Sequence, residues 1–203
     1  GDPNSGVIVG DDSCMVIDAQ ATQAMAADLI ARVAKVTDKP IKYVLLSHYH
    51  AVRVLGASAF KGAEILASDA TRGLIAERGK QDMDSEIGRF PRLFRAVETI
   101  PGLTWPSITF PDQMSVWLGR REVRIMHIGR GHTAGDVIAA VPDCGVVFAG
   151  DLVVSQCACS CGDAHFTDWP QTLDILAEMQ PAALLPGRGA ALTTQEKVKE
   201  GIN

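Results

Sequence analysis

Short apolar runs rich in β-branched residues alternate along this chain with segments of helical periodicity, and this alternation constrains the fold most strongly. Such runs have the length of strands, and strands that alternate with helices pack in layers. We therefore predict an α/β domain whose sheets pack face to face with helices outside. The expected strands are Gly6–Val9, Cys14–Ile17, Lys42–Leu46, Ile65–Ala67, a hairpin over Trp117–Ile128 that turns near Gly119-Arg120, Val137–Val141, Val146–Ala149 and Ala183–Leu185. The expected helices are Thr22–Val36, a helix from an Asp69 cap to about Arg78, Asp82–Val97 with a break at Pro91, and Trp169–Met179 after a cap at Asp168.

The composition is that of an ordinary globular protein. Of the 203 residues, 47% are hydrophobic and 21% are charged, which excludes a disordered chain, and we expect one domain over residues 1–203. The net charge of −5 argues against a nucleic-acid partner. No apolar run approaches the roughly 18 residues of a membrane span. These features predict a small-molecule ligand and leave the oligomeric state undefined.

The first residues, Gly1-Asp2-Pro3, have neither the basic nor the apolar region of a secretory signal and include no Met. We therefore favour a cytoplasmic over a periplasmic location, without fixing either, and expect the chain to be trimmed at this end.

The five cysteines do not form a disulfide framework, because their number is odd and three of them crowd into Cys157, Cys159 and Cys161. We expect free thiols. The crowded segment follows Asp151 by six residues, so it should border any site that contains this aspartate. It then either recruits a soft metal, forms a redox-active thiol, or is a loop of small residues.

Three polar clusters follow predicted strands, where α/β proteins commonly place their sites. His48 and His50 are two residues apart, so in an extended segment their imidazoles point the same way. His132 follows Gly131 in a turn, and Asp151 follows Gly150. Neutral imidazoles are ligands for zinc or another borderline metal, and Asp151 can ligate a metal or hold a water molecule. A single histidine at the end of a strand is more often part of a structural hydrogen bond than a metal ligand, so the interpretation depends on all three clusters together.

Together, these clusters resemble the motifs of the metallo-β-lactamase superfamily, and the resemblance extends over nearly the whole chain. It implies an αββα sandwich of two mixed sheets, with a metal site at one edge of both. It also implies His48, His50, His132 and Asp151 as metal ligands. The matching segments are Val16–Asp18, Ser47–Arg53, Gly131–Asp136, Gly150-Asp151 and Pro186–Gly189.

Two ligand positions of that family's second metal are altered. The aspartate of its His-x-His-x-Asp motif is Val52, followed by Arg53, and the histidine of its closing Pro-Gly-His-Gly motif is Arg188. A valine cannot ligate, and an arginine cannot be deprotonated to do so. We infer a site for one metal.

The resemblance implies a hydrolase that uses a zinc-bound hydroxide on an ester, thioester, lactone or lactam carbonyl. His132 and Asp151 are the expected catalytic residues, with Asp151 orienting the water or acting as its base. Arg53 and Arg188 either bind an anionic group of the substrate or pair with Asp151. Tyr49 either faces the substrate or packs between strands.

Two alternatives use the same residues. His48, His132 and Asp151 could form the two-histidine, one-carboxylate ligand pattern of a non-haem iron oxygenase. The resemblance implies this alternative as well, since the superfamily looks to include iron dioxygenases that act on persulfides. A catalytically silent relative would instead bind only an anion, through Arg53 and Arg188. Outside the site, we expect His127 in the core or on the surface, His165 near the rim, and Trp105 and Trp117 in the core.

Overall fold

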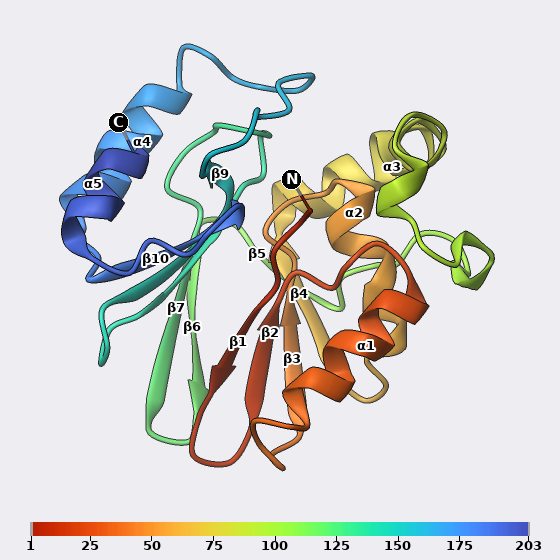
Figure 1. Cartoon of the computed structure of the whole chain (residues 1–203), viewed down its shortest axis with the longest axis horizontal. Coiled ribbons are helices and arrows are strands. Elements are labelled where there is room, and N and C mark those ends of the chain that lie inside the picture. The colour runs from red at the N-terminus through yellow and green to blue at the C-terminus, as the bar shows by residue number, and fades with distance from the viewer. Residues whose placement is uncertain (1, 203) are drawn as a thin grey trace.

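The computed structural model describes residues 2–202 and contains two five-stranded sheets packed face to face, with helices on both outer faces (Figure 1). This architecture confirms the predicted αββα sandwich. The first sheet has the order β1 (Gly6–Val9), β2 (Cys14–Ile17), β3 (Ile41–Leu45), β4 (Glu64–Ser68) and β5 (Ile108–Phe110). The second has the order β10 (Ala183–Arg188), β9 (Val146–Val154), β8 (Ile138–Val141), β7 (Arg121–Met126) and β6 (Gln113–Leu118).

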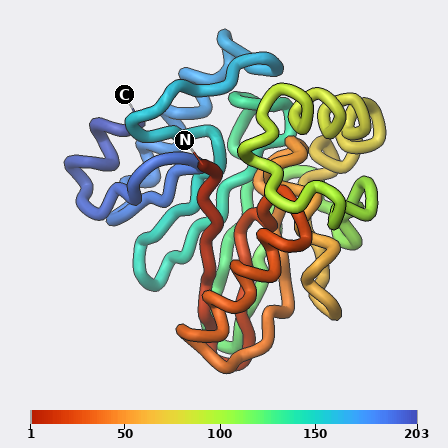
Figure 2. Tube along the Cα trace, turned by 45° about the vertical axis from the view of Figure 1, so that its right-hand side comes forward, coloured from red at the N-terminus to blue at the C-terminus, as the bar shows by residue number. Residues whose placement is uncertain are grey.

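Both sheets are mixed. In the first, β1 is antiparallel to β2, and β2 to β5 run parallel. In the second, β6 to β9 are antiparallel, and β10 is parallel to β9. The N-terminal segment runs beside the end of β10 in the second sheet (Figure 2), where the Asn4 backbone N–H donates to Gly187 O at 2.8 Å.

The core lies between the sheets because alternate side chains of each strand face inward. Met15 and Ile17 of β2 belong to this inner cluster, together with Val123 and Ile125 of β7. The intervening Val16 packs in a second cluster, toward the helices. All four residues of β2 are buried, which is expected for a strand covered on both faces.

The helices cover the outer faces. The first sheet carries α1 (Gln23–Val33), the short α2 (Ala51–Val54) and α3 (Asp69–Arg89), and the second carries α4 (Trp169–Glu178) and α5 (Gln195–Ile202) (Figure 1). Short 3₁₀ helices span Leu55–Ala59, Pro91–Leu93 and Val97–Thr99. Among residues 2–202, no helix has both the length and the hydrophobicity that a membrane span requires.

The prediction of two helices between Asp69 and Val97 is wrong. A single helix, α3, runs through Arg89, because no proline separates Arg78 from Asp82 and the intervening Gly79 is buried within the helix. Its N-cap is Ser68, whose hydroxyl accepts from Thr71 N–H at 3.1 Å, so Asp69 is not the cap. The predicted break at Pro91 is observed as the end of the helix.

Two further predictions need correction. Trp117 is 58% exposed because it alternates with the buried Val116 and Leu118 on β6. Trp105 is 44% exposed and lies under the Arg72 guanidinium, 5.5 Å from the ring centre, so neither tryptophan is in the core. Asp168 occupies the N-cap position of α4, as predicted, but its side chain makes no capping hydrogen bond and its carboxylate pairs with Arg130 instead.

Candidate metal centre

The ends of three structural segments bring the histidines together. His48 lies in the turn after β3, and His50 is the residue immediately before α2. His132 lies in the loop between β7 and β8. The two neighbouring histidines are therefore in a turn rather than in the extended segment that we expected. Asp151 lies inside β9, beside a register irregularity in its pairing with β10, rather than after the end of a strand.

The three imidazoles converge on one point. Each offers a ring nitrogen, and these three nitrogens lie within 4.8 Å of one another. His132 Nε2 is 3.0 Å from His50 Nδ1. His48 and His132 are 1% exposed, and His50 is 8% exposed. Among residues 2–202, no other group of three or more His, Cys, Asp or Glu side chains has this arrangement.

A hydrogen-bond chain orients His48. The Ser47 hydroxyl donates to Asp18 Oδ2 at 2.9 Å and lies 2.9 Å from His48 Nδ1, so it accepts from this nitrogen. The proton is thereby held on Nδ1, and the lone pair remains on Nε2. This Nε2 is buried, and no residue among 2–202 hydrogen-bonds to it. A buried, unpaired lone pair is costly unless a ligand uses it, so it fits a metal.

His50 is oriented differently. Its Nε2 lies 3.2 Å from Asp163 Oδ2, and because an ionised carboxylate only accepts, this nitrogen carries the proton. The other ring nitrogen, Nδ1, then faces His132. Sequence reasoning missed Asp163, which lies 113 residues from His50 in a loop with no motif of its own.

Burial keeps the other two imidazoles neutral. It lowers the pKa of His48 well below its ordinary value and that of His132 to about 4. Burial opposes protonation of His50 as well, but the hydrogen bond that His50 donates to Asp163 and the nearby carboxylates of Asp82 and Glu86 raise its pKa overall. Neutral imidazole is the form that binds metals, so His48 and His132 are in the state that suits a zinc-type ion.

Asp151 lies against this centre and against both arginines. Its Oδ2 is 3.9 Å from His48 Nε2, 3.6 Å from His132 Nε2 and 3.3 Å from Arg188 Nε. Its Oδ1 pairs with Arg53 Nη2. Burial alone would raise the pKa of Asp151, but the charges of Arg53 and Arg188 hold it below its ordinary value. The salt-bridge alternative for the two arginines therefore describes their observed contacts.

Arg53 is fully enclosed. It also approaches Asp18 Oδ2 at 3.3 Å and donates to the carbonyl oxygens of Asn4 and Gly187, each at 2.7 Å. With 0% exposure, its guanidinium is not accessible to a substrate in this structure. The side chain of Arg188 retains 13% exposure. Gly187 is required here, because a Cβ at this position would lie 1.9 Å from Asp151 Oδ1.

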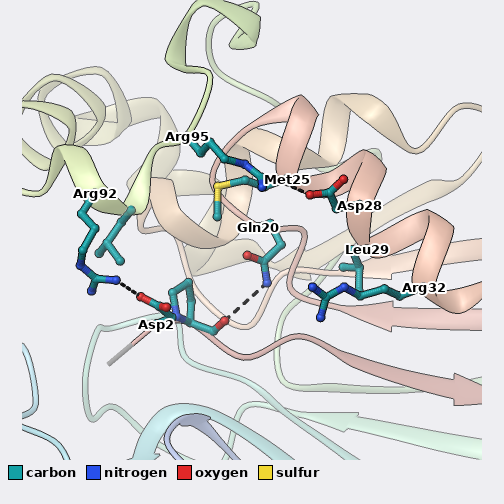
Figure 3. Close-up of a pocket in the computed structure, with 10 residues that line it drawn as sticks. Asp2, Gln20, Met25, Asp28, Leu29, Arg32, Arg92 and Arg95 are labelled. Carbon is teal, nitrogen blue, oxygen red and sulfur yellow. Dashed lines mark hydrogen bonds and ion pairs between the residues drawn. The ribbon is translucent and has the colours of Figure 1, made fainter.

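A polar cavity of about 510 Å³ adjoins His50. It lies between α3 and the loop that carries Asp163, and Tyr49 lines it as well. The Tyr49 side chain is only 3% exposed, and its hydroxyl donates to Asp163. A second cavity, of about 400 Å³, lies between α1 and residues 92–95 (Figure 3). None of the three histidines lines it, and Arg92 and Arg95 are paired there with Asp2 and Asp28.

The remaining predicted residues lie outside the cluster. His127 Nδ1 bonds the carbonyl oxygen of Asp136 at 2.7 Å, and the backbone of His165 donates to Gly131 O at 2.8 Å. All five cysteines are free, as predicted. Burial, more than any other cause, raises the pKa of Cys159 to about 12, so this thiol is protonated at neutral pH.

The comparisons with known proteins agree with the fold. The family model for the metallo-β-lactamase superfamily matches residues 1–188, and the chain belongs to that superfamily. The metallo-β-lactamase type 2 of Bacteroides fragilis is 24% identical over an alignment of 211 positions, gaps included, which covers 99% of this chain and 76% of that protein.

Two further relatives show how widely the fold is shared. The linear primary-alkylsulfatase of Pseudomonas sp. (strain ATCC 19151) is 20% identical over 96% of this chain, which spans 43% of that enzyme. A solved metallo-β-lactamase from Pontibacter korlensis has a TM-score of 0.76 at 20% identity, covering 97% of this chain and 83% of that one. Similarity at this level establishes the fold, not the substrate.

Proposed function

We propose that this protein is a metal-dependent hydrolase with a single zinc-type ion, held by His48 Nε2, His50 Nδ1 and His132 Nε2. The observation that carries the proposal is the buried, unpaired Nε2 of His48, which faces the two other imidazoles. Superfamily membership supports the reaction class. When bound, such an ion supplies Lewis acidity, which lowers the pKa of water and polarises a carbonyl oxygen.

A second ion is not part of the proposal. Val52 offers no donor atom, and the guanidinium groups of Arg53 and Arg188 contact Asp151, which would otherwise bridge two ions. Two fixed positive charges beside this carboxylate oppose another cation. They also favour the ionised carboxylate, so we assign to Asp151 the orientation of water rather than the uptake of its proton.

The proposed substrate is a small molecule with an ester, thioester, lactone or lactam carbonyl. The cavity beside His50 would hold its polar portion, and Tyr49 would form part of the wall. The partly exposed Arg188 is the proposed contact for an anionic group, by bidentate hydrogen bonding. Arg53 is assigned a structural role, because its burial leaves no surface for a ligand.

A metal count tests this proposal. We expect about one zinc per chain in the purified protein, by elemental analysis after reconstitution and dialysis. His48→Ala and His132→Ala should each lose the metal and all hydrolysis. His127→Ala is the matched control, because it removes an imidazole outside the cluster and should retain both. A screen of esters, thioesters, lactones and lactams then defines the substrate class.

The other possible outcomes separate the alternatives. Asp151 Oδ2 lies within 4 Å of both His48 Nε2 and His132 Nε2, which is the observation in favour of a two-histidine, one-carboxylate iron site. Iron in the protein as isolated, together with oxygen consumption, would support that function. Absence of any metal after reconstitution would overturn the hydrolase and support a relative that binds anions only.

A further inference from the structure

Asp163 joins three parts of the molecule that are distant in sequence. It lies in the loop of residues 155–168, between β9 and α4, which also carries three cysteines. Its Oδ2 accepts from the Tyr49 hydroxyl and from His50 Nε2, at 3.2 Å for the latter. Its Oδ1 accepts from Arg78 Nη1 of α3, also at 3.2 Å. One carboxylate therefore fixes the loop both to α3 and to the turn that carries Tyr49 and His50.

The contact with His50 has a chemical consequence. A neutral imidazole exchanges its proton between two nitrogens unless a hydrogen bond selects one tautomer. The Asp163 carboxylate selects the tautomer with hydrogen on Nε2, which leaves the Nδ1 lone pair toward His132 Nε2, 3.0 Å away. His50 makes no capping hydrogen bond to α2, so its position in the turn does not orient the ring.

The neighbouring histidine does not depend on this carboxylate. His48 is oriented by Ser47 and Asp18, which lie just after strands β3 and β2 of the first sheet. The loop carrying Asp163, in contrast, follows β9 of the second sheet. Two ligands that are adjacent in sequence are thus oriented by groups from opposite halves of the molecule.

We propose that Asp163 is a positioning residue of the metal centre: it holds the His50 imidazole with Nδ1 available for the ion, and it ties the loop of residues 155–168 to that ligand. This inference rests on the proposed function, since it concerns the same three histidines. It adds that metal binding depends on a loop residue that contributes no metal ligand.

Metal affinity gives the first test. Asp163→Ala in the full chain should weaken zinc binding about 10- to 100-fold in competition with a chromogenic chelator, as for other carboxylates that orient ligating histidines. Asp163→Asn keeps the size and one acceptor, and should fall between this variant and the wild type. Arg78→Gln is the matched control: it removes the other contact of the same carboxylate and should stay within about threefold, as expected for an exposed ion pair.

The tautomer of His50 gives a readout that a purely structural role would not change. In metal-free protein, ¹⁵N-detected imidazole NMR should show hydrogen on Nε2 in the wild type and in Tyr49→Phe, and a tautomer mixture in Asp163→Ala. Tyr49→Phe releases the hydroxyl contact but keeps the contact with His50. Its zinc affinity should therefore fall much less than that of Asp163→Ala.

Three results would overturn the inference: wild-type zinc affinity in Asp163→Ala, an unchanged His50 tautomer in that variant, or an equal loss of affinity in Tyr49→Phe. Its failure can be told apart from that of the proposed function. If Asp163→Ala behaves as expected but no substrate is hydrolysed, only the proposed reaction fails. If the wild type hydrolyses substrate and Asp163→Ala binds zinc equally well, only the inference fails. A wild type that binds no metal would overturn both.

Discussion

At the scale of single residues, Arg53 is the side chain whose environment sequence reasoning could least define. Its position in the His-x-His motif predicted a place near the centre, and its contacts place it there. Whether a guanidinium faces a substrate or a carboxylate depends on what encloses it. Here, the enclosing groups include the Asn4 and Gly187 carbonyls, which are 49 and 134 residues away along the chain.

Removing this charge should destabilise the protein. Arg53→Gln leaves the buried Asp18 and Asp151 without the cation that they share, and we expect a loss of about 3–5 kcal/mol in the free energy of unfolding. Urea denaturation of metal-free protein measures it. Arg95→Gln is the control, because its exposed pair with Asp28 should contribute about 0–1 kcal/mol. Equal losses in the two variants would contradict the structural role of Arg53.

The histidines show what a sequence can predict about a site. His48, His50, His132 and Asp151 were predicted because each lies in a short polar cluster beside an apolar run. Asp163 could not be predicted in this way, since it lies in the cysteine-rich loop of residues 155–168, and its partners are defined only by folding. The extended geometry expected for His48 and His50 was wrong because the chain turns after β3 to begin α2.

At the scale of elements, α3 is the clearest difference between prediction and structure. Helical periodicity predicted its two portions, but packing decides their junction. A Cβ added at Gly79 would lie 3.4 Å from side-chain atoms of Ile75 and Leu103. The continuous helix forms one wall of the cavity beside His50. Asp82 Oδ2 accepts from Ala51 N–H at 2.8 Å, and Glu86 Oε2 accepts from Val52 N–H at 3.2 Å, so α3 fixes the start of α2.

Helix α3 also allows a test of stability that is independent of the site. A side chain at Gly73 would meet nothing within 4 Å, and glycine is unfavourable inside a helix. Gly73→Ala should raise the free energy of unfolding by about 0.5–1 kcal/mol. Gly187→Ala is the opposite case, since its Cβ would collide with Asp151, and it should destabilise the protein. Thermal unfolding of both variants checks this pair, and destabilisation by Gly73→Ala would show that α3 is not a regular helix at this point.

The other wrong predictions about elements concern a strand at the edge of a sheet and a side chain on the surface. Strand β5 has three residues, and its alternation is too short to be recognised in the sequence. Trp117 was assigned to the core by its hydrophobicity, whereas the alternation along β6 directs its neighbours Val116 and Leu118 inward. Periodicity over at least four residues was therefore a better guide to burial than residue type.

At the scale of the whole molecule, the order of the strands divides the chain into two successive halves. Residues 6–110 form the first sheet, and residues 113–188 form the second. The resemblance to the superfamily predicted this sandwich, because its motifs are distributed over both halves. The first half contributes His48 and His50 to the centre, and the second contributes His132 and Asp151.

A metal that bridges the halves should stabilise the native state, since the unfolded chain has no preformed centre. At a free zinc concentration 100 times Kd, we expect a gain of about 2.7 kcal/mol and a rise in Tm of roughly 5–10 °C. Removal of the zinc by a chelator should reverse both changes. Differential scanning calorimetry of wild type and His48→Ala, each with and without zinc, measures the effect. An equal rise in the variant would show that zinc acts at another place.

Successive parts of the chain form the two sheets, so one break in the backbone, at Pro111-Asp112, would separate His48 and His50 from His132. Severing the polypeptide there would leave two imidazoles on one fragment and the third on the other. Recovery of metal by the mixed fragments would then report that the two pieces had found each other again.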